Sequence, residues 1–356
     1  MYRCDRVSAV PRSVKKSMDL SDFYEKYTHA YGVPIISSKE VPDKAIRRAC
    51  YVVQVMLADR QDIRDSVYNS YGRIGIIGFL QNTTDVPEHD FLDEYYNTRA
   101  RGLGGTMYAP ISTAGEENIL CYPKDSYHDE DILVHEFAHG IHRLGLEPID
   151  DTFTPKLLAS FEDARNRGLW NHTYAATNSQ EYLAKGVQIY FNVNGVPFKG
   201  IDNQVNTRAK LRRYDRKLYK LVREIFPCGN EIIDRCFHAE CSDQDVEENC
   251  RIWKGDNECE TNPKYMITHC KRTCNICDFG GRGYPGDKPH MNCQSDQNST
   301  PQLKLNKVKK VNNKKSKNRK NNLTKASDTF KEVSNTIKLS NKLEHQQGQT
   351  GKPQRR

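Results

Sequence analysis

The sequence predicts an α+β fold: a mostly helical domain with a small sheet, followed by a small disulfide-rich module and a basic, disordered tail. Apolar residues recur at helical spacing along 41–58, whereas an isoleucine-rich segment at 73–79 and a glycine turn at 101–108 indicate strands. Six cysteines fall within 241–277, a density at which covalent cross-links must replace an apolar core. Lysine and asparagine dominate the end of the chain, which has too few apolar residues to fold.

These patterns divide the chain into four predicted parts: a flexible N-terminal segment (1–20), a main domain (21–236), the cysteine-rich module (241–277) and a low-complexity tail (278–356). The elements expected in the main domain are a short helix at 19–29, a core helix at 41–58, a buried strand at 73–79, an edge strand near 106–111, a solvated loop at Glu116 and Glu117, and one long basic helix at 207–226. For 106–111 an internal strand is the alternative.

The segment 131–140 contains the string His-Glu-x-x-His, a short motif typical of zinc peptidases. On a helix, residues four apart share one face, so His135 and His139 can contact one ion. Glu136 lies beside that face, where a carboxylate can act as general base on a metal-bound water. Asp131 is a candidate N-cap of this helix, and Gly145 is a candidate stop.

Catalytic zinc usually takes three protein ligands, so a further ligand is required. Gly145 occupies the position at which one family pattern places a third histidine, and His142 lies further along the helix axis. Two carboxylates remain as candidates. Glu162 lies on a predicted helix at 155–167, and Glu181 falls in the first turn of a helix that Asn178 or Ser179 can cap.

Residues 174–184 read Tyr-Ala-Ala-Thr-Asn-Ser-Gln-Glu-Tyr-Leu-Ala. With the histidine motif they resemble the C-terminal peptidase domain of anthrax lethal factor and its family of gluzincin metallopeptidases. The resemblance implies a zincin-type fold, a Zn²⁺ cofactor and endopeptidase activity on peptide or protein substrates. It also implies that Glu181 is the third ligand and that Tyr174 stabilises the oxyanion. Lys185 departs from the family pattern, which often has an acid at that position.

The cysteine-rich module resembles the ShK-toxin-like domain, including its ending Cys270-Lys-Arg-Thr-Cys274-Asn-Ile-Cys277. The resemblance implies three disulfides: Cys241–Cys277, Cys250–Cys270 and Cys259–Cys274. Lys264 and Tyr265 occupy the position of a potassium-channel-blocking dyad in toxin members, although a packing role for the tyrosine and a general cell-surface partner are the alternatives. A competing function for the whole chain is therefore a weak or inactive peptidase scaffold that binds through this module.

Cysteine content and glycosylation acceptors indicate an extracellular protein, although no signal peptide is visible in residues 1–20. The chain has twelve cysteines and the Asn-x-Ser/Thr acceptors Asn82, Asn171, Asn298 and Asn322. It has no apolar run long enough to span a membrane. The sequence leaves open how the six cysteines outside the module pair; one predicted pair is Cys228–Cys236, which would close a short loop. These cysteines are Cys4, Cys50, Cys121, Cys228, Cys236 and Cys293.

Positive charge is concentrated in the tail, because residues 294–356 contain sixteen Lys or Arg and four Asp or Glu against a net charge of +8 for the whole chain. Outside the cell such a segment favours sulfated, anionic polysaccharides. The basic helix expected at 207–226 lacks the interleaved aromatic residues of a nucleic-acid surface, so we expect no specific nucleic-acid partner.

Overall fold

The computed structural model describes Cys4, 6–122, 124–195 and 204–236, and in the module Asp243, 245–262, 265–266, 269–270 and 272–273. Six strands form one mixed sheet in the order β1-β2-β3-β4-β6-β5, in which β3, β4 and β6 run parallel and the other neighbours are antiparallel. The strands are β1 (Ser8–Ala9), β2 (Lys26–Ala30), β3 (Val33–Ser37), β4 (Arg73–Ile77), β5 (Gly102–Leu103) and β6 (Ile111–Gly115).

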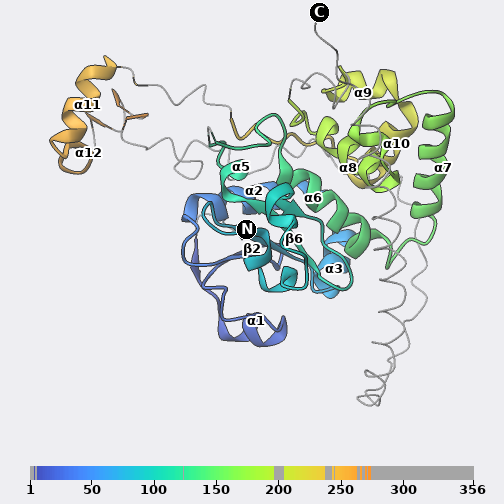
Figure 1. Cartoon of the computed structure of the whole chain (residues 1–356), viewed down its shortest axis with the longest axis horizontal. Helices are drawn as coiled ribbons and strands as arrows, with labels where there is room; N and C mark the ends of the chain where they lie inside the picture. Colours follow the sequence, from blue (N-terminus) through green and yellow to red (C-terminus); the bar gives the residue numbers. More distant parts are fainter. Residues whose placement is uncertain are drawn as a thin grey trace, which may run out of the picture. The chain divides into compact units, whose positions relative to one another are not determined.

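Helices are the predominant secondary structure of the described residues and accompany one small mixed sheet, which confirms the predicted α+β class (Figure 1). In the main domain they are α1 (Arg12–Ser17), α2 (Asp43–Met56), α3 (Gln61–Asn69), α4 (Tyr96–Arg99), α5 (Glu116–Ile119), α6 (Ile132–Gly140), α7 (Phe153–Asn166), α8 (Ser179–Tyr190), α9 (Arg208–Tyr214) and α10 (Arg216–Ile225). Short 3₁₀ turns occupy Thr83–Asp85, Pro87–His89 and Tyr174–Ala176, and a π-helical turn, Ile141–Leu146, follows α6. No described helix is long and apolar enough to cross a membrane.

The two faces of the sheet pack against different partners. Ile35, Ile74 and Ile76 belong to the large core that includes residues of α2, α6 and α8, whereas Ile36 and Ile77 belong to a smaller cluster with Met18, Leu20 and Tyr24. Side chains alternate between faces along a strand, so β3, β4 and β6 each contribute to both clusters. Helix α6 lies between β6 and α8, and this position places the histidine motif at the junction of the sheet and the helices.

Several predicted elements need correction. Residues 8–20 are not irregular, because β1 pairs with β2, and α1 is followed by the buried Met18 and Leu20. Residues 19–29 form no helix. Instead β2 begins at Lys26, and its burial alternates along the strand because it pairs with β3. Glu116 and Glu117 are buried in α5 rather than solvated; Glu117 pairs with Arg101.

The long basic helix expected at 207–226 is two helices, α9 and α10, separated at Asp215. Asp215 is buried, and its carboxylate accepts a hydrogen bond from the backbone N–H of Leu218, which caps α10. The same carboxylate accepts hydrogen bonds from the indole of Trp170 and the hydroxyl of Tyr182. These contacts hold Asp215 at the boundary between α9 and α10. At this position its carboxylate accepts from an N–H group at the start of α10, which has no partner within the helix.

In the module, the described residues include two helices, α11 (Glu247–Gly255) and α12 (Glu258–Thr261) (Figure 1). Cys250, Met266 and Cys270 form a small buried cluster, against which Trp253 packs. The disulfide Cys250–Cys270 links its two sides and confirms one of the three predicted pairs. The pairs Cys241–Cys277 and Cys259–Cys274, and the tail 278–356, lie outside the residues whose side chains are described.

Candidate metal centre

Helix α6 carries the histidine motif, and its start is fixed by the predicted N-cap. The carboxylate of Asp131 accepts a hydrogen bond from the N–H of Val134 at 3.2 Å, and Arg48 donates to the same carboxylate at 3.3 Å in a fully buried pair. The helical path continues through the π-helical turn and ends one residue after Gly145. His135 and His139 therefore project from one face, and their Nε2 atoms lie 3.2 Å apart.

The third donor comes from helix α8. The side chain of Asn178 caps this helix by accepting hydrogen bonds from the N–H groups of Gln180 and Glu181, both at 2.9 Å. Glu181 therefore lies in the first turn, with its Oε2 at 2.9 Å from Nε2 of His135 and 3.4 Å from Nε2 of His139. Ligand atoms at tetrahedral positions about 2.0–2.1 Å from a zinc ion are separated by about 3.3 Å, so the three donors fit one face of such a site.

A buried amide selects the tautomer of His135. Gln188 donates its Nε2–H to the carbonyl of Asp131 at 3.0 Å, so its Oε1 is the atom that faces Nδ1 of His135 at 3.1 Å. Since Oε1 can only accept, Nδ1 carries the proton and the lone pair of Nε2 points to the donor cluster. Hydrogen bonding of the distal nitrogen is the usual support of a metal-bound imidazole.

Glu136 and Tyr174 complete the arrangement around a cavity of about 950 Å³, which the three donors also line. The pKa of Glu136 is raised to about 8, mainly by burial; His139 lowers this pKa, and the carboxylates of Glu181 and Glu130 raise it. A bound dication would also lower the pKa of Glu136, as His139 does. Tyr174 is 47% exposed and lies over His135, with 6.1 Å between ring centroids. Burial of its phenol, together with Glu181 and Glu136, raises its pKa, so it is a proton donor at neutral pH.

The pKa of Glu181 has opposing causes. Burial would raise it, but the hydrogen bonds and charges of His135 and His139, when these imidazoles are protonated, lower it well below the usual value. The carboxylate is therefore ionised at all physiological pH values, as a metal ligand must be.

The sheet edge beside α6 is β5, not the predicted segment 106–111. Residues 106–110 form a loop, and Ile111 begins β6, which is internal to the sheet. β5 can approach the helix because glycines lie in it and directly after it: a Cβ on Gly102 would lie 2.6 Å from Ile132 Cγ2, and one on Gly104 would overlap the side chain of His139. The edge strand therefore lines the cavity.

The other candidate ligands lie elsewhere. The side chain of Glu162 is 58% exposed and pairs with Arg165 on the surface of α7. His142 is buried, with its Nε2 at 2.9 Å from the hydroxyl of Thr154, and burial lowers its pKa to about 4. Neither residue belongs to the cluster of His135, His139 and Glu181.

Lys185, the departure from the family pattern, has an acidic partner from another part of the chain. Its Nζ lies 2.9 Å from Oε2 of Glu130 and 2.7 Å from Oδ1 of Asn194, and its side chain is 2% exposed. Burial raises the pKa of Glu130, but Lys185 reverses this effect and the net shift is downward. An acid is thus present beside the site, although it comes from the loop before α6 rather than from α8. Sequence spacing did not reveal this pair.

In the module, Tyr265 is an anchored residue. Its hydroxyl donates a hydrogen bond to Asp245 at 2.9 Å, and its ring lies 4.3 Å from the ring of His269 and 5.7 Å from that of Trp253, between centroids. The side chain nevertheless remains 38% exposed. Lys264, its predicted dyad partner, lies outside the described residues.

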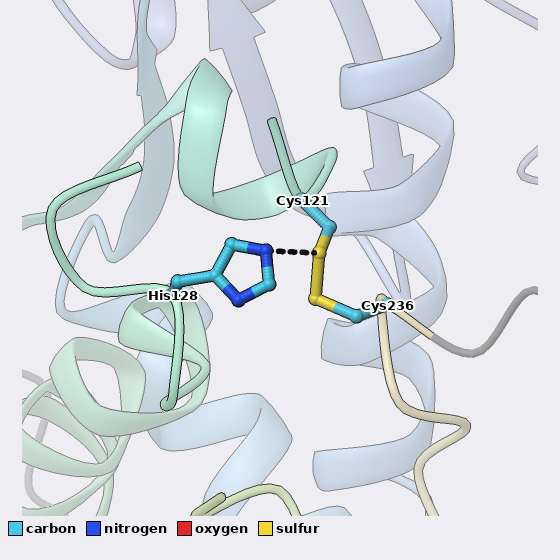
Figure 2. A group of neighbouring side chains, drawn as sticks. All are labelled: Cys121, His128 and Cys236. Carbon is cyan, nitrogen blue, oxygen red and sulfur yellow. Dashed lines mark hydrogen bonds between the residues drawn. A yellow bond between two sulfur atoms is a disulfide. The ribbon is translucent and has the colours of Figure 1, made fainter. Parts of the chain in front are cut away.

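The pairing of the remaining cysteines differs from the predicted Cys228–Cys236 loop. Cys236 instead pairs with Cys121, across a sequence separation of 115 (Figure 2). Cys4 pairs with Cys50. Cys228 is disulfide-bonded as well. The short loop does not form because residues 231–236 are held along α2 and the loop before α6: Arg48 donates to the carbonyl of Ile233, and Tyr51 accepts from its N–H through the hydroxyl.

Comparison with known proteins assigns the module. Residues 240–277 match the ShK domain-like family model, which confirms that prediction. The chain is 34% identical over 71 residues to a peptidyl serine alpha-galactosyltransferase of Chlamydomonas reinhardtii; this match spans 19% of the chain and only 10% of that protein. The solved structure of the Pro-Pro endopeptidase PPEP-2 from Paenibacillus alvei aligns with a TM-score of 0.34 and 14% identity, over 50% of this chain and 91% of that one.

Proposed function

We propose that residues 21–236 form a zinc-dependent endopeptidase that acts outside the cell on peptide or protein substrates. The observation that carries the proposal is the convergence of His135, His139 and Glu181 at tetrahedral spacing, with Glu136 beside them in an open cavity. The resemblance of 174–184 to the lethal factor family supports the same ligand set and the same role for Tyr174. Glu130 supplies an acid beside the site, where this chain has Lys185 in place of the acid of the family pattern.

His135, His139 and Glu181 would hold Zn²⁺, which when bound lowers the pKa of a water and polarises the scissile carbonyl. Glu136 accepts the proton of the attacking water and passes it to the leaving amine. Tyr174 donates its hydroxyl proton in a hydrogen bond to the developing oxyanion. The edge strand β5 lines the cavity and offers backbone groups that would pair with an extended substrate.

The test compares the wild-type chain with Glu136→Gln and with the surface control Glu162→Gln. Zinc content is measured by elemental analysis, and cleavage of a mixed peptide library by mass spectrometry. We expect about one zinc per chain in all three proteins, and a loss of turnover by roughly 10²–10⁴-fold only in Glu136→Gln. Wild-type protein that binds zinc but cleaves no peptide, or equal cleavage by Glu136→Gln, would contradict the proposal.

An extracellular location agrees with the disulfides and with two exposed glycosylation acceptors, Asn82 and Asn171. Expression through a secretory pathway should attach glycans at both positions. The measurement is the mass lost on treatment with an N-glycosidase, compared between wild type and the Asn82→Gln and Asn171→Gln variants.

The module supports a second candidate function, binding to a potassium channel or another cell-surface partner. The supporting observations are the ShK domain-like match and the partly exposed Tyr265. A lysine ammonium can enter a carbonyl-lined pore, so Lys264→Ala should abolish block of a potassium current, whereas Glu136→Gln should not. Block that is unaffected by Lys264→Ala would contradict the channel dyad. The basic tail is proposed to bind sulfated polysaccharide, which salt should release.

A further inference from the structure

A second group of potential metal donors lies beside the loop that leads into α6. Cys121 follows α5, Cys236 ends the described part of the main domain, and His128 lies in the loop between α5 and α6 (Figure 2). Nε2 of His128 is 3.3 Å from Sγ of Cys121, and all three donor atoms lie within 4.8 Å of one another. His128 is exposed and the two cysteines are partly buried, so solvent and solutes reach the group.

The spacing of these atoms is close to that of a zinc site. With Zn–S of about 2.3 Å and Zn–N of about 2.05 Å, a tetrahedral ion separates two thiolates by about 3.7 Å, and a thiolate from an imidazole nitrogen by about 3.6 Å. The observed N···S distance is already near that value. The Cα atoms of Cys121 and Cys236 are 5.3 Å apart, so opening the disulfide requires only a change of side-chain rotamers to accommodate both sulfurs on one ion.

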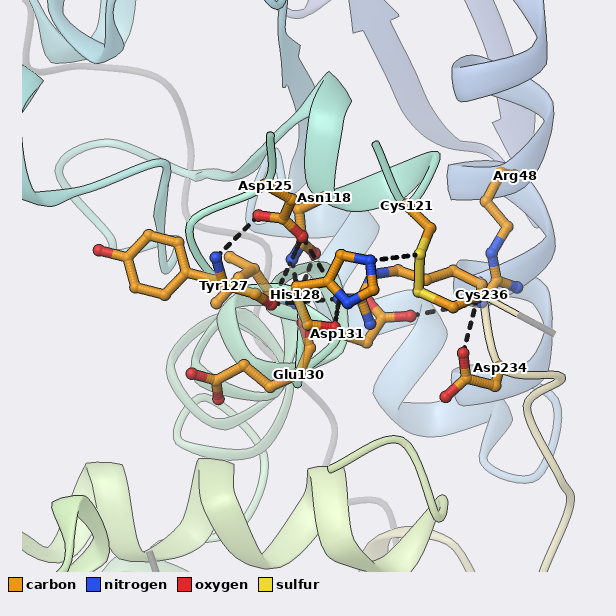
Figure 3. The surroundings of a disulfide bond; sticks show 12 residues. Arg48, Asn118, Cys121, Asp125, Tyr127, His128, Glu130, Asp131, Asp234 and Cys236 are labelled. Carbon is orange, nitrogen blue, oxygen red and sulfur yellow. Dashed lines mark hydrogen bonds and ion pairs between the residues drawn. A yellow bond between two sulfur atoms is a disulfide. The ribbon is translucent and has the colours of Figure 1, made fainter. Parts of the chain in front are cut away.

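The backbone around this group is held by contacts that do not depend on the disulfide (Figure 3). Arg235, which precedes Cys236, donates to the carbonyls of Tyr127 at 3.1 Å and His128 at 2.7 Å, and it pairs with the buried Asp125 at 3.4 Å. The amide of Asn118 donates to the same Asp125 at 2.9 Å. Because the hydrogen bonds of Arg235 hold the segment of Cys236 against the backbone of His128, the two cysteines and His128 stay close together after the disulfide is reduced.

We propose that the dithiol form of this chain binds a soft divalent cation, Zn²⁺ in biological media, through Cys121, His128 and Cys236. An external dithiol transfers two electrons to the disulfide; the S–S bond breaks, two protons complete the thiols, and the reductant becomes a cyclic disulfide. Ion binding then releases both thiol protons, and neutral His128 contributes Nε2. Thiolate and imidazole donors favour zinc over the hard cations Mg²⁺ and Ca²⁺.

This site is chemically distinct from the proposed catalytic centre, which has two imidazoles and a carboxylate but no sulfur. The difference permits a selective probe, because Co²⁺ bound by thiolate gives a sulfur-to-metal charge-transfer band in the near ultraviolet and Co²⁺ bound only by nitrogen and oxygen does not. The part of the band that is lost when Cys121 and Cys236 are replaced therefore reports on the second site, whether or not the chain is a peptidase.

The experiment titrates Co²⁺ into the full chain after treatment with a dithiol and anaerobic removal of the reductant. Four proteins are compared: wild type, Cys121→Ser/Cys236→Ser, His128→Gln and Glu181→Ala. We expect the charge-transfer band in wild type and Glu181→Ala, its loss in the double cysteine variant, and an affinity at least roughly tenfold weaker in His128→Gln. All other cysteines remain in the double variant, so it controls for binding elsewhere.

His128→Gln also guards against misfolding, because it keeps the disulfide and should leave the thermal midpoint of the oxidised protein unchanged. Absence of the band in reduced wild type would overturn the proposal. So would a band that persists at full intensity in Cys121→Ser/Cys236→Ser, or an affinity in His128→Gln equal to that of wild type.

Discussion

The candidate metal centre and the module are stabilised in opposite ways. The candidate centre is set in a large apolar core, and two of its three donors are oriented by a neighbour: Gln188 for His135, and Asn178 for the helix of Glu181. The described part of the module has a buried cluster of only three residues, two of which form the disulfide Cys250–Cys270. The contrast indicates that the metal centre depends on hydrogen-bonded geometry, whereas the module depends on covalent cross-links.

The chain contains two tryptophans, and they report on the two regions separately. Trp170 is buried in the main domain, where its indole donates to Asp215, whereas Trp253 packs on the cluster of the module. In Trp253→Phe the fluorescence reports the main domain alone, and in Trp170→Phe it reports the module alone.

The largest effect is expected for removal of the carboxylate ligand. Glu181→Ala leaves two imidazoles, and we expect zinc affinity to fall by on the order of 10³-fold or more, because a structural or catalytic site needs at least three protein donors. Competition with a chelator measures the affinity. Glu162→Ala is the matched control and should bind zinc as wild type does; an equal loss in both variants would show that the carboxylates act through stability instead.

Removal of the cross-link should affect only the module. A disulfide that closes a loop of this length, with a sequence separation of 20 between Cys250 and Cys270, contributes about 3 kcal/mol in the loop-entropy treatment. In Cys250→Ser/Cys270→Ser, the denaturant midpoint reported by Trp253 should therefore fall, while that reported by Trp170 and the zinc content stay constant. A common shift at both tryptophans would contradict the separation of the two regions.

Loss of the Gln188 amide, which contacts His135, should weaken zinc binding without unfolding the domain. Gln188→Met removes the acceptor for Nδ1 of His135, and we expect zinc affinity to decrease by roughly 10–100-fold. Gln188→Glu keeps an acceptor at the same position and should retain most of the affinity. The comparison fails if the methionine variant binds zinc as tightly as wild type at equal folded fraction.

Acid should destabilise the main domain through His142. Burial lowers the pKa of His142 to about 4, whereas an unfolded histidine titrates near 6.5. As the pH falls, His142 is protonated in the unfolded chain at a higher pH than in the folded chain. The contribution of neutral His142 to the free energy of unfolding is therefore fully present above pH 6.5 and is lost as the pH falls toward 4. The expected loss between pH 8 and pH 5 is about 2 kcal/mol.

The measurement is urea unfolding of metal-free protein monitored at Trp170. His142→Gln keeps a polar side chain opposite Thr154 and should flatten the pH dependence by that amount, whereas the midpoint of the module, followed at Trp253, should be unaffected by the substitution. An unchanged slope in His142→Gln would assign the acid sensitivity to other groups.

Sequence patterns predicted the core of the site because its interactions are local. The four-residue spacing of His135 and His139, the Asp131 cap and the Asn178 cap each involve one turn of one helix. Gln188 could also have been found, since it follows Glu181 by seven residues and thus lies two turns along the same face of α8. The pairing of Lys185 with Glu130 could not be predicted from the sequence, because an ion pair between a helix and a distant loop produces no regular spacing in the sequence.

By itself the sequence determined the fold class, the helix that carries the histidines, the ShK-like module and the contrast between an acidic body and a basic tail. Only the tertiary structure decided that β5 is the sheet edge beside α6, that Cys236 pairs with Cys121, and that Asp215 divides the basic helix. The physical reason is contact range. Capping and periodicity act within a few residues, whereas strand order, disulfide partners and buried polar contacts depend on which distant segments the folded core brings together.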